Sequence, residues 1–402
     1  MNNKWQFVFL LLIVLMGMST LKVSYILTFK FYQLIIPILF IIFLLDDLLN
    51  RKLNIKIISF LFISSILLSL ISLNSTYEKI GEIKFIIKYI VLFPASFYIG
   101  YKFIEKLNIQ NIVRSYEIFA IIHLSIAILF LYYPIEFLYH RRGSLPSFQG
   151  TFWEPSGLGM ALGLALLIII SLRYEFKLVP KKPLLYFSFI IAIVIAIIYA
   201  KTKAFWFATS LSLVFIIFDK IFSIIIKYKY LEISKNFKLP FILKLKLKYI
   251  IAIIIISSIT IALANSLMEN PFISKEIIKE KLETERGLAF IKAIELLENS
   301  KFIGGYGWGF IEAYFSNRNL GIVGLGEGVS MIFNSYLNEW ITVGIIGLMF
   351  HLILLKIAYS KKHLFTMLIP LYLFFLANVH PLLGSEVYYF TLGLSYGLKK
   401  FY

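Results

Sequence analysis

The chain is a succession of apolar runs of about 20 residues that are separated by short polar joints. A helical run of this length crosses the hydrocarbon core of a membrane. A membrane barrel would instead show segments of about ten residues in which apolar and polar positions alternate, and the chain contains none. We therefore expect one all-α, polytopic membrane domain over residues 1–402, with about twelve transmembrane helices. The expected spans are 5–21, 32–49, 57–73, 85–101, 115–133, 157–172, 184–200, 204–219, 249–266, 332–355, 364–379 and 386–398.

One long interval, 268–330, departs from this pattern between the ninth and tenth spans. It begins with charged sequence of helical periodicity and continues with glycines and aromatic residues. We expect an amphipathic helix within 274–299 that lies on the membrane or caps the bundle. The apolar face of this helix is predicted to carry Phe290, Ile291, Ile294 and Leu297, and the polar face Lys292, Glu295 and Asn299. The glycines of 304–309 interrupt the helix and allow a close backbone approach to a ligand.

Composition supports a membrane protein and excludes several other classes. Hydrophobic residues make up 60% of the chain, and the mean hydropathy is +0.85. The net charge is +18, but the basic residues gather in alternate joints, which is the pattern of membrane topology and not of a nucleic-acid-binding surface. The chain contains no cysteine, which excludes a disulfide framework and a thiol nucleophile.

The distribution of Lys and Arg predicts an orientation in the membrane. The most basic joints are 50–56, 102–114, 173–183, 220–248 and 356–363. We place them in the cytoplasm together with both termini, and we expect the first span to stay uncleaved. The outer side then carries the loop 134–156, the turn 201–203 and the long interval 268–330. We interpret the basic segment 220–248 as a cytoplasmic anchor on anionic lipid in preference to a regulatory site.

Several basic residues lie on the predicted outer side, against the usual distribution of charge. Arg141 and Arg142 are adjacent, Lys203 follows a short turn, and Arg286 opens the amphipathic helix. An anionic ligand would account for them, because a guanidinium group matches phosphate oxygens. Alternatives remain open, since Arg286 can pair with Glu283 and Lys203 can reach lipid phosphates.

Glu154 is the clearest candidate carboxylate, because it lies where the sixth span begins on the outer side. An acidic residue followed by Pro155 also suits the first turn of a helix, so a capping role is a strong alternative. In the functional interpretation, Glu154 binds a sugar hydroxyl or accepts a proton. Glu327 and Glu339 are the other outer-side carboxylates to consider.

Aromatic residues accompany the glycines on the predicted outer side, namely Trp153, Tyr306, Trp308, Phe310 and Tyr314. Aromatic belts at membrane interfaces explain most residues of this kind, but their density beside glycines also suits stacking on sugar rings. The sequence has no His and carboxylate cluster with metal-ligand spacing and no phosphate-binding loop of the nucleotide type. We therefore expect neither a metal nor another cofactor.

Four stretches, in this order, resemble motifs of the O-antigen polymerase and O-antigen ligase family of bacterial envelope glycosyltransferases. GTFWEPSGLG resembles the Gly-x-Phe-x-Glu-Pro start of a central span, and AKTKAFWFA resembles the turn with Thr or Ser before Arg. ERGLAFIKAIELLENSKFIGGYGWGF is similar to the outer-loop arginine, helix and Gly-x-Gly run. FNSYLNEWITVGIIG is similar to the helix that begins with His-Asn.

The resemblance implies a metal-independent glycosyltransferase in the bacterial cytoplasmic membrane, with its active site on the periplasmic side. It would join repeat units carried on undecaprenyl diphosphate into O-antigen or capsular polysaccharide. The implied partners are this lipid-linked glycan, membrane lipid and a chain-length regulator protein, without nucleic acid. The implied catalytic residues are Arg286, Arg142 and Glu154, and the implied substrate-binding residues are Lys203, Arg141, Gly305, Gly307, Trp308 and Asn334.

The chain departs from the family pattern at several positions. Phe333 precedes Asn334 where ligases have His, and Lys203 stands where Arg is usual. Arg142 is also farther from the Gly-x-Phe-x-Glu-Pro stretch than the early arginine of the family. The missing His weakens the ligase interpretation, in which finished glycan moves to a lipid or protein acceptor. A flippase or transporter of lipid-linked glycan is a third alternative, although the sequence shows no convincing internal repeat.

Overall fold

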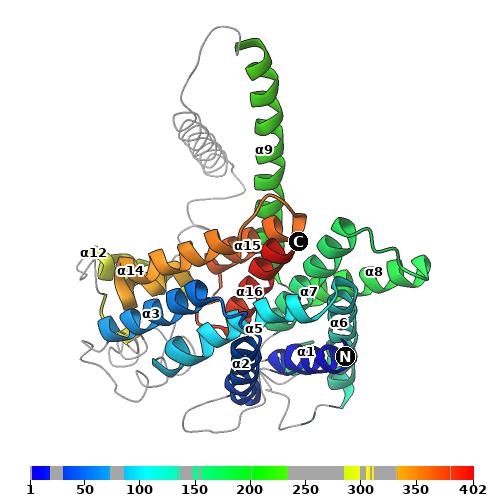
Figure 1. Cartoon of the computed structure of the whole chain (residues 1–402), viewed down its shortest axis with the longest axis horizontal. Helices are drawn as coiled ribbons and strands as arrows, with labels where there is room; N and C mark the ends of the chain where they lie inside the picture. Colours follow the sequence, from blue (N-terminus) through cyan, green and yellow to red (C-terminus); the bar gives the residue numbers. More distant parts are fainter. Residues whose placement is uncertain are drawn as a thin grey trace.

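The computed structural model describes residues 2–18, 30–72, 86–133, 135, 148–152, 155–200, 202–233, 285–298, 305–307, 310–311, 332, 334–380 and 382–402. The described residues form helices, with no β-strand element among them (Figure 1). The helices are α1 (Asn2–Gly17), α2 (Phe31–Leu49), α3 (Ile55–Ser72), η1 (Lys88–Leu92), α5 (Phe93–Lys106), α6 (Ile109–Tyr132), α7 (Pro155–Glu175), α8 (Pro183–Tyr199), α9 (Lys203–Ile233), α12 (Glu285–Glu298), α14 (Ser335–Ala358), α15 (Leu364–Ala377) and α16 (Glu386–Phe401).

A helix coincides with every predicted span except 249–266, which lies outside the described residues. The helices α2, α6, α7 and α14 are long and apolar enough to cross a membrane. Shorter apolar helices lie in α1, α3, α8 and α15. These apolar helices indicate a membrane-embedded, all-helical protein, whereas the number of spans remains a prediction.

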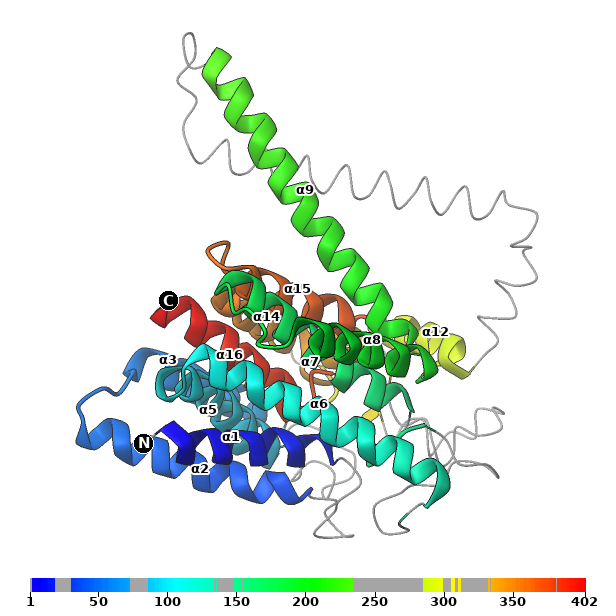
Figure 2. The same cartoon turned by 90° about the vertical axis from the view of Figure 1, so that its right-hand side faces the viewer.

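The structure differs from the sequence-based expectation in α9 and in two irregular helices. The basic joint was expected to begin at residue 220, but α9 continues to Ile233, and its second half projects away from the other helices (Figures 1 and 2). The fourth predicted span begins with the π-helix η1 before α5 follows. The tenth predicted span is interrupted at Gly344, which has a φ of 75° inside α14.

The centre of the bundle is the contact between α5 and α16. A Cβ atom on Gly100 would overlap the carbonyl oxygen of Phe390, and one on Gly393 would overlap the carbonyl oxygen of Phe97. Glycines therefore let the two backbones touch, as they do where membrane helices pack closely. Phe93 stacks on Tyr389 beside this contact, with ring centroids 4.2 Å apart.

Both termini lie at one end of the bundle, which we call the termini end (Figure 2). The connections from α2 to α3 and from α14 to α15 lie at the same end. Ion pairs join the helix ends there, such as Arg173 with Glu117 at 2.6 Å. The grouping agrees with the predicted topology, because all of these segments were expected on the cytoplasmic side.

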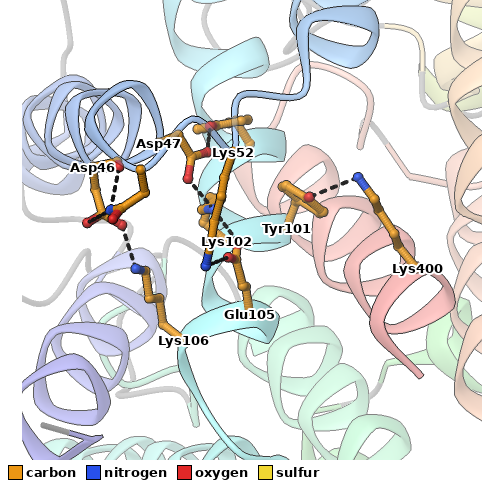
Figure 3. Close-up of polar contacts among 10 residues, drawn as sticks. Asp46, Asp47, Lys52, Tyr101, Lys102, Glu105, Lys106 and Lys400 are labelled. Atoms are coloured by element: carbon orange, nitrogen blue, oxygen red, sulfur yellow. Dashed lines mark hydrogen bonds and ion pairs between the residues drawn. The ribbon is translucent and has the colours of Figure 1, made fainter.

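A network of six charged side chains holds the α2–α3 corner against α5 at the termini end (Figure 3). Its members are Asp46, Asp47, Lys52, Lys102, Glu105 and Lys106. Lys102 is the buried centre: its ammonium lies 2.5 Å from Asp47, and the two side chains are 1% and 2% exposed. Three carboxylates balance three ammonium groups, so the network is a structural feature and leaves no charge over for a ligand.

Candidate functional site

A cavity of about 390 Å³ lies between α1, α2, α7, α15 and α16, toward the end of the bundle opposite the termini. We call this space the rim cavity. Its polar lining residues are Lys30, Tyr32, Ser156, Tyr372, His380 and Ser385. The remaining lining is apolar and includes Met160, Leu164 and Leu373. The combination suits an amphipathic ligand, because apolar walls bind hydrocarbon while a few polar groups orient the headgroup.

The ends of helices position the polar residues of the rim cavity. Lys30 is the N-cap of α2, and its backbone N–H donates to the side-chain oxygen of Gln33 at 2.8 Å. Ser385 is the N-cap of α16, and Ser156 lies in the first turn of α7. All three residues therefore lie at or near the first residue of a helix, and their side chains line the same cavity.

The connection between α15 and α16 is held by Ser335 at the start of α14. The Ser335 hydroxyl donates to the carbonyl oxygen of His380 at 2.7 Å and accepts from the backbone N–H of Leu382 at 2.7 Å. These bonds fix the backbone on both sides of the segment that presents His380 to the cavity. They also connect the stretch 333–347 to the cavity, although Ser335 itself is not part of the lining.

A carboxylate lies behind the cavity wall. Glu386 is 2% exposed and accepts from the hydroxyl of Tyr32 at 3.0 Å and from the side-chain amide of Gln33 at 2.5 Å. Tyr32 lines the cavity, whereas Glu386 does not. Glu386 holds the cavity residue Tyr32 in place.

The stretch 150–159 contributes directly to the rim cavity through Phe152, Ser156 and Gly157. The helix α7 begins at Pro155, as its position in the sequence predicts. A Cβ atom on Gly159 would overlap Thr202 Oγ1, so the stretch 200–208 packs directly on this helix. Lys203 begins α9 with an exposed side chain and does not line the cavity.

The glycines of the long interval pair with the backbone of α14. The N–H groups of Tyr306 and Gly307 donate to the carbonyl oxygens of Ile341 and Thr342 at 2.8 and 2.7 Å. Gly305 has a φ of 63°, and a Cβ atom there would overlap Thr342 O. The close approach predicted for these glycines is therefore made to α14, whose break leaves the two carbonyls available.

Helix α12 lies within the interval where an amphipathic helix was predicted. Ala293 and Leu296 pack in one apolar cluster with residues of α14, and Leu297 of the predicted apolar face packs against it. Ile291 and Ile294 of that face are exposed to the surroundings of the bundle. Lys292 pairs with Glu295 at 2.5 Å.

The remaining candidates divide into those that the structure places and those that it does not. Asn334 caps α14, since its side-chain oxygen accepts from the N–H of Leu337 at 3.0 Å. Glu339 is buried and does not line the rim cavity. Arg286 lies in α12, but its side chain is outside the described residues. Arg141, Arg142, Glu154, Trp308 and Glu327 also lie outside them.

Sequence reasoning missed the contribution of Lys30, Tyr32, His380 and Ser385 to a site. Lys30 carried a signal of the same kind as Lys203, because it is a basic residue on a predicted outer joint. The other three gave none, since single polar residues at span ends are common. Among the described residues, no cluster of His, Asp and Glu has the arrangement of a metal site.

A comparison with models of known protein families finds no match, and a search of curated proteins finds no significant match either. The four stretches of the chain and the geometry of the rim cavity are therefore the features that bear on its function.

Proposed function

We propose that the protein polymerises oligosaccharide repeat units carried on undecaprenyl diphosphate into O-antigen or capsular polysaccharide, on the outer face of a bacterial cytoplasmic membrane. The rim cavity is the observation that carries the proposal. It combines apolar walls of α7 and α15 with Lys30 and His380 at its polar end. A polyprenyl diphosphate needs both features, because its chain is hydrocarbon and its headgroup is anionic.

The arrangement of the four stretches supports the same proposal. Gly159 of the first contacts Thr202 of the second, and Gly307 of the third bonds to Thr342 of the fourth. Ser335 of the fourth holds the segment that lines the cavity beside the first. Stretches far apart in the sequence are thus connected through short contacts, and the first of them lines the cavity.

The chemistry assigns two tasks to these residues. The leaving diphosphate gains negative charge in the transition state, and preorganised cations stabilise it most effectively in a site that excludes water. Lys30 is in the cavity for this task, and Arg286, Arg142, Arg141 and Lys203 are the further cations that we propose for it. The attacking sugar hydroxyl gains from a general base, for which we propose Glu154, because its neighbour Ser156 lines the cavity.

The glycan made by a strain that lacks the gene tests the proposed function. We expect surface glycan with a single repeat unit on the normal anchor, seen as the loss of the ladder on a gel. Polymer stranded on the polyprenyl lipid would instead indicate the ligase. Absence of all surface glycan, with repeat units trapped inside the cell, would indicate a flippase.

Arg286→Ala tests the role of the long interval. We expect loss of polymer at a normal amount of inserted protein, because the cation at the donor diphosphate is missing. Lys292→Ala, on the same helix, is the matched control and should leave the polymer unchanged, since Lys292 pairs with Glu295. Normal polymer from Arg286→Ala would contradict the assignment.

One observation favours the transporter as a second candidate function. The helix α14 is broken at Gly344 and carries the buried carboxylate of Glu339. Broken helices with buried polar groups are common where transporters bind their substrates and coupling ions. The gel described above separates the two functions, because a transporter mutant displays no glycan at the surface.

A further inference from the structure

Two irregular helices meet at the buried carboxylate of Glu339. The break in α14 at Gly344 follows it by less than two turns, and the π-helix η1 carries Tyr89 opposite. The Tyr89 hydroxyl lies 2.6 and 2.7 Å from the two carboxylate oxygens and donates to the carboxylate. Such interruptions are uncommon and occur frequently at functional positions.

An imidazole shares this buried space with the carboxylate. His351, from the part of α14 beyond the break, is fully buried, and its Nε2 lies 3.4 Å from Glu339 Oε1. Within the described part of the chain, neither ring nitrogen of His351 has a hydrogen-bond partner, and neither has the hydroxyl of Tyr388, whose ring contacts the imidazole. Since buried polar groups are nearly always paired, these atoms call for an explanation.

Among the described residues, the surroundings of the pair supply phenols, and η1 adds Lys88, whose ammonium lies 3.4 Å from the carbonyl oxygen of Gly384. The titratable groups that face the pair from α16 and from α14 itself are Tyr388, Tyr389 and Tyr336. The sequence of α15 holds no charged residue, and α3 has only Lys56, exposed in its first turn. Among the described residues, α12 meets α14 through apolar side chains. Glu386 interacts electrostatically with Tyr389, but its carboxylate already accepts hydrogen bonds from Tyr32 and Gln33 of α2.

A shared proton satisfies this arrangement better than a metal cation does. A buried carboxylate is costly in an apolar interior unless it is neutralised, and an acceptor nitrogen beside it can hold the same proton. Hard cations prefer sets of oxygen ligands, while imidazole is a ligand of softer metals. Tyr89 also directs its proton, not its lone pairs, toward the carboxylate.

We propose that Glu339 and His351 form an intramembrane proton-binding site that exchanges one proton with the aqueous phase. The proton binds at Glu339 Oε1 or at His351 Nε2, and no other bond is made or broken. The two residues lie on opposite sides of the Gly344 break, so a proton bound between them links the two parts of α14. The segment 335–343 also receives the N–H groups of Tyr306 and Gly307, which couples the site to the glycine run.

An infrared pH titration of the full-length protein in detergent tests this proposal. We expect a carboxyl C=O band that rises on acidification, is lost in Glu339→Gln and moves to a different pH midpoint in His351→Gln. Glu386→Gln is the matched control, because Glu386 is also a buried carboxylate with a tyrosine donor, and this variant should keep the band. The protection factors of the Tyr306 and Gly307 amides, corrected for the intrinsic exchange rate at each pH, should change across the same pH range in the wild type only.

Several outcomes would overturn the proposal. They are a band that does not titrate in the wild type, a band that survives in Glu339→Gln, and a midpoint unaffected by His351→Gln. Displacement of the band by sodium at constant pH would reveal a metal cation site instead. If Glu339→Gln does not fold, Tyr89→Phe keeps the ring and removes one donor, and it should shift the frequency of the same band. An unshifted band in that variant would equally exclude Glu339.

Discussion

Single residues set how closely the helices approach one another. Gly159 lies against Thr202 with no room for a side chain, and Gly305 lies against the carbonyl of Thr342. At the termini end, one ammonium group at Lys102 compensates a buried carboxylate at Asp47. Each of these residues therefore allows a quantitative test of the packing.

Gly159→Ala should destabilise the protein by about 1–3 kcal/mol, because the new Cβ atom overlaps Thr202 Oγ1 and the neighbouring helices must shift. Thermal unfolding of the purified protein in detergent measures the effect. Gly384→Ala is the matched control, since a Cβ atom there meets nothing within 4 Å. Equal stability of the two variants would show that α7 does not pack on Thr202 in this way.

Lys102→Met should destabilise the fold by about 3–5 kcal/mol, because it leaves the Asp47 carboxylate buried without its cation. Lys106→Met removes a partly exposed partner of Asp46 and should cost no more than about 1 kcal/mol. The double variant Lys102→Met/Asp47→Leu should recover most of the lost stability. Denaturant unfolding would refute the buried pair if Lys102→Met and Lys106→Met behaved alike.

At the scale of elements, the break in α14 determines what the long interval can bind. In a continuous helix, the carbonyl oxygens of Ile341 and Thr342 would accept hydrogen bonds from N–H groups of the same helix. Because α14 is broken at Gly344, they accept instead from the N–H groups of Tyr306 and Gly307. The interruption therefore attaches the glycine run to the bundle. Helix α12 packs on the same segment of α14.

Gly344→Ala should cost about 1–3 kcal/mol, because its φ of 75° and ψ of −169° lie in a region that is essentially restricted to glycine. We also expect faster amide exchange at Tyr306 and Gly307, since a repaired helix withdraws their acceptors. Hydrogen exchange followed by mass spectrometry measures this. Ile346→Ala, at a partly exposed position of the same helix, is the control and should leave exchange at the glycine run unchanged.

The sequence predicted elements well where hydrophobicity alone determines them. The span expected at 32–49 is the helix Phe31–Leu49, because an apolar run between polar joints has few alternatives. The extension of α9, the break at Gly344 and the burial of Ala293 in α12 were not predicted. Each depends on contacts between segments distant in the sequence, which a local pattern does not contain.

The candidate site was predictable only in part, for the same reason. The stretch 150–159 was recognised and does line the cavity, but Tyr32, His380 and Ser385 belong to it through tertiary contacts. Gly305 and Gly307 were assigned to a ligand, and the structure gives them a backbone partner in α14.

At the scale of the whole molecule, the rim cavity and the charge network occupy opposite ends of one bundle. The charges of the network are matched with one another, and the cavity at the other end has Lys30 among its lining residues. This polarity supports a protein that is anchored at one end and binds its substrate at the other.

Under the proposed function, Lys30→Ala should lower polymer formation by a factor on the order of 100, because it removes a cation that we propose for the diphosphate. Lys30→Arg should retain much of the activity, since a guanidinium group also binds phosphate. Lys181→Ala, exposed at the termini end, is the control. A gel of surface glycan normalised to the amount of inserted protein measures the three variants, and unchanged polymer in Lys30→Ala would remove Lys30 from the proposed site.

The glycine contact between α5 and α16 has a consequence for biosynthesis. Helix α5 is synthesised early, but its partner follows only after residues 107–385 have been translated. At about 5–20 residues per second, the glycine face of α5 waits for roughly 15–60 s before α16 can cover it. During that interval lipid or an insertion chaperone must occupy the face, so the nascent chain passes through a long-lived assembly intermediate.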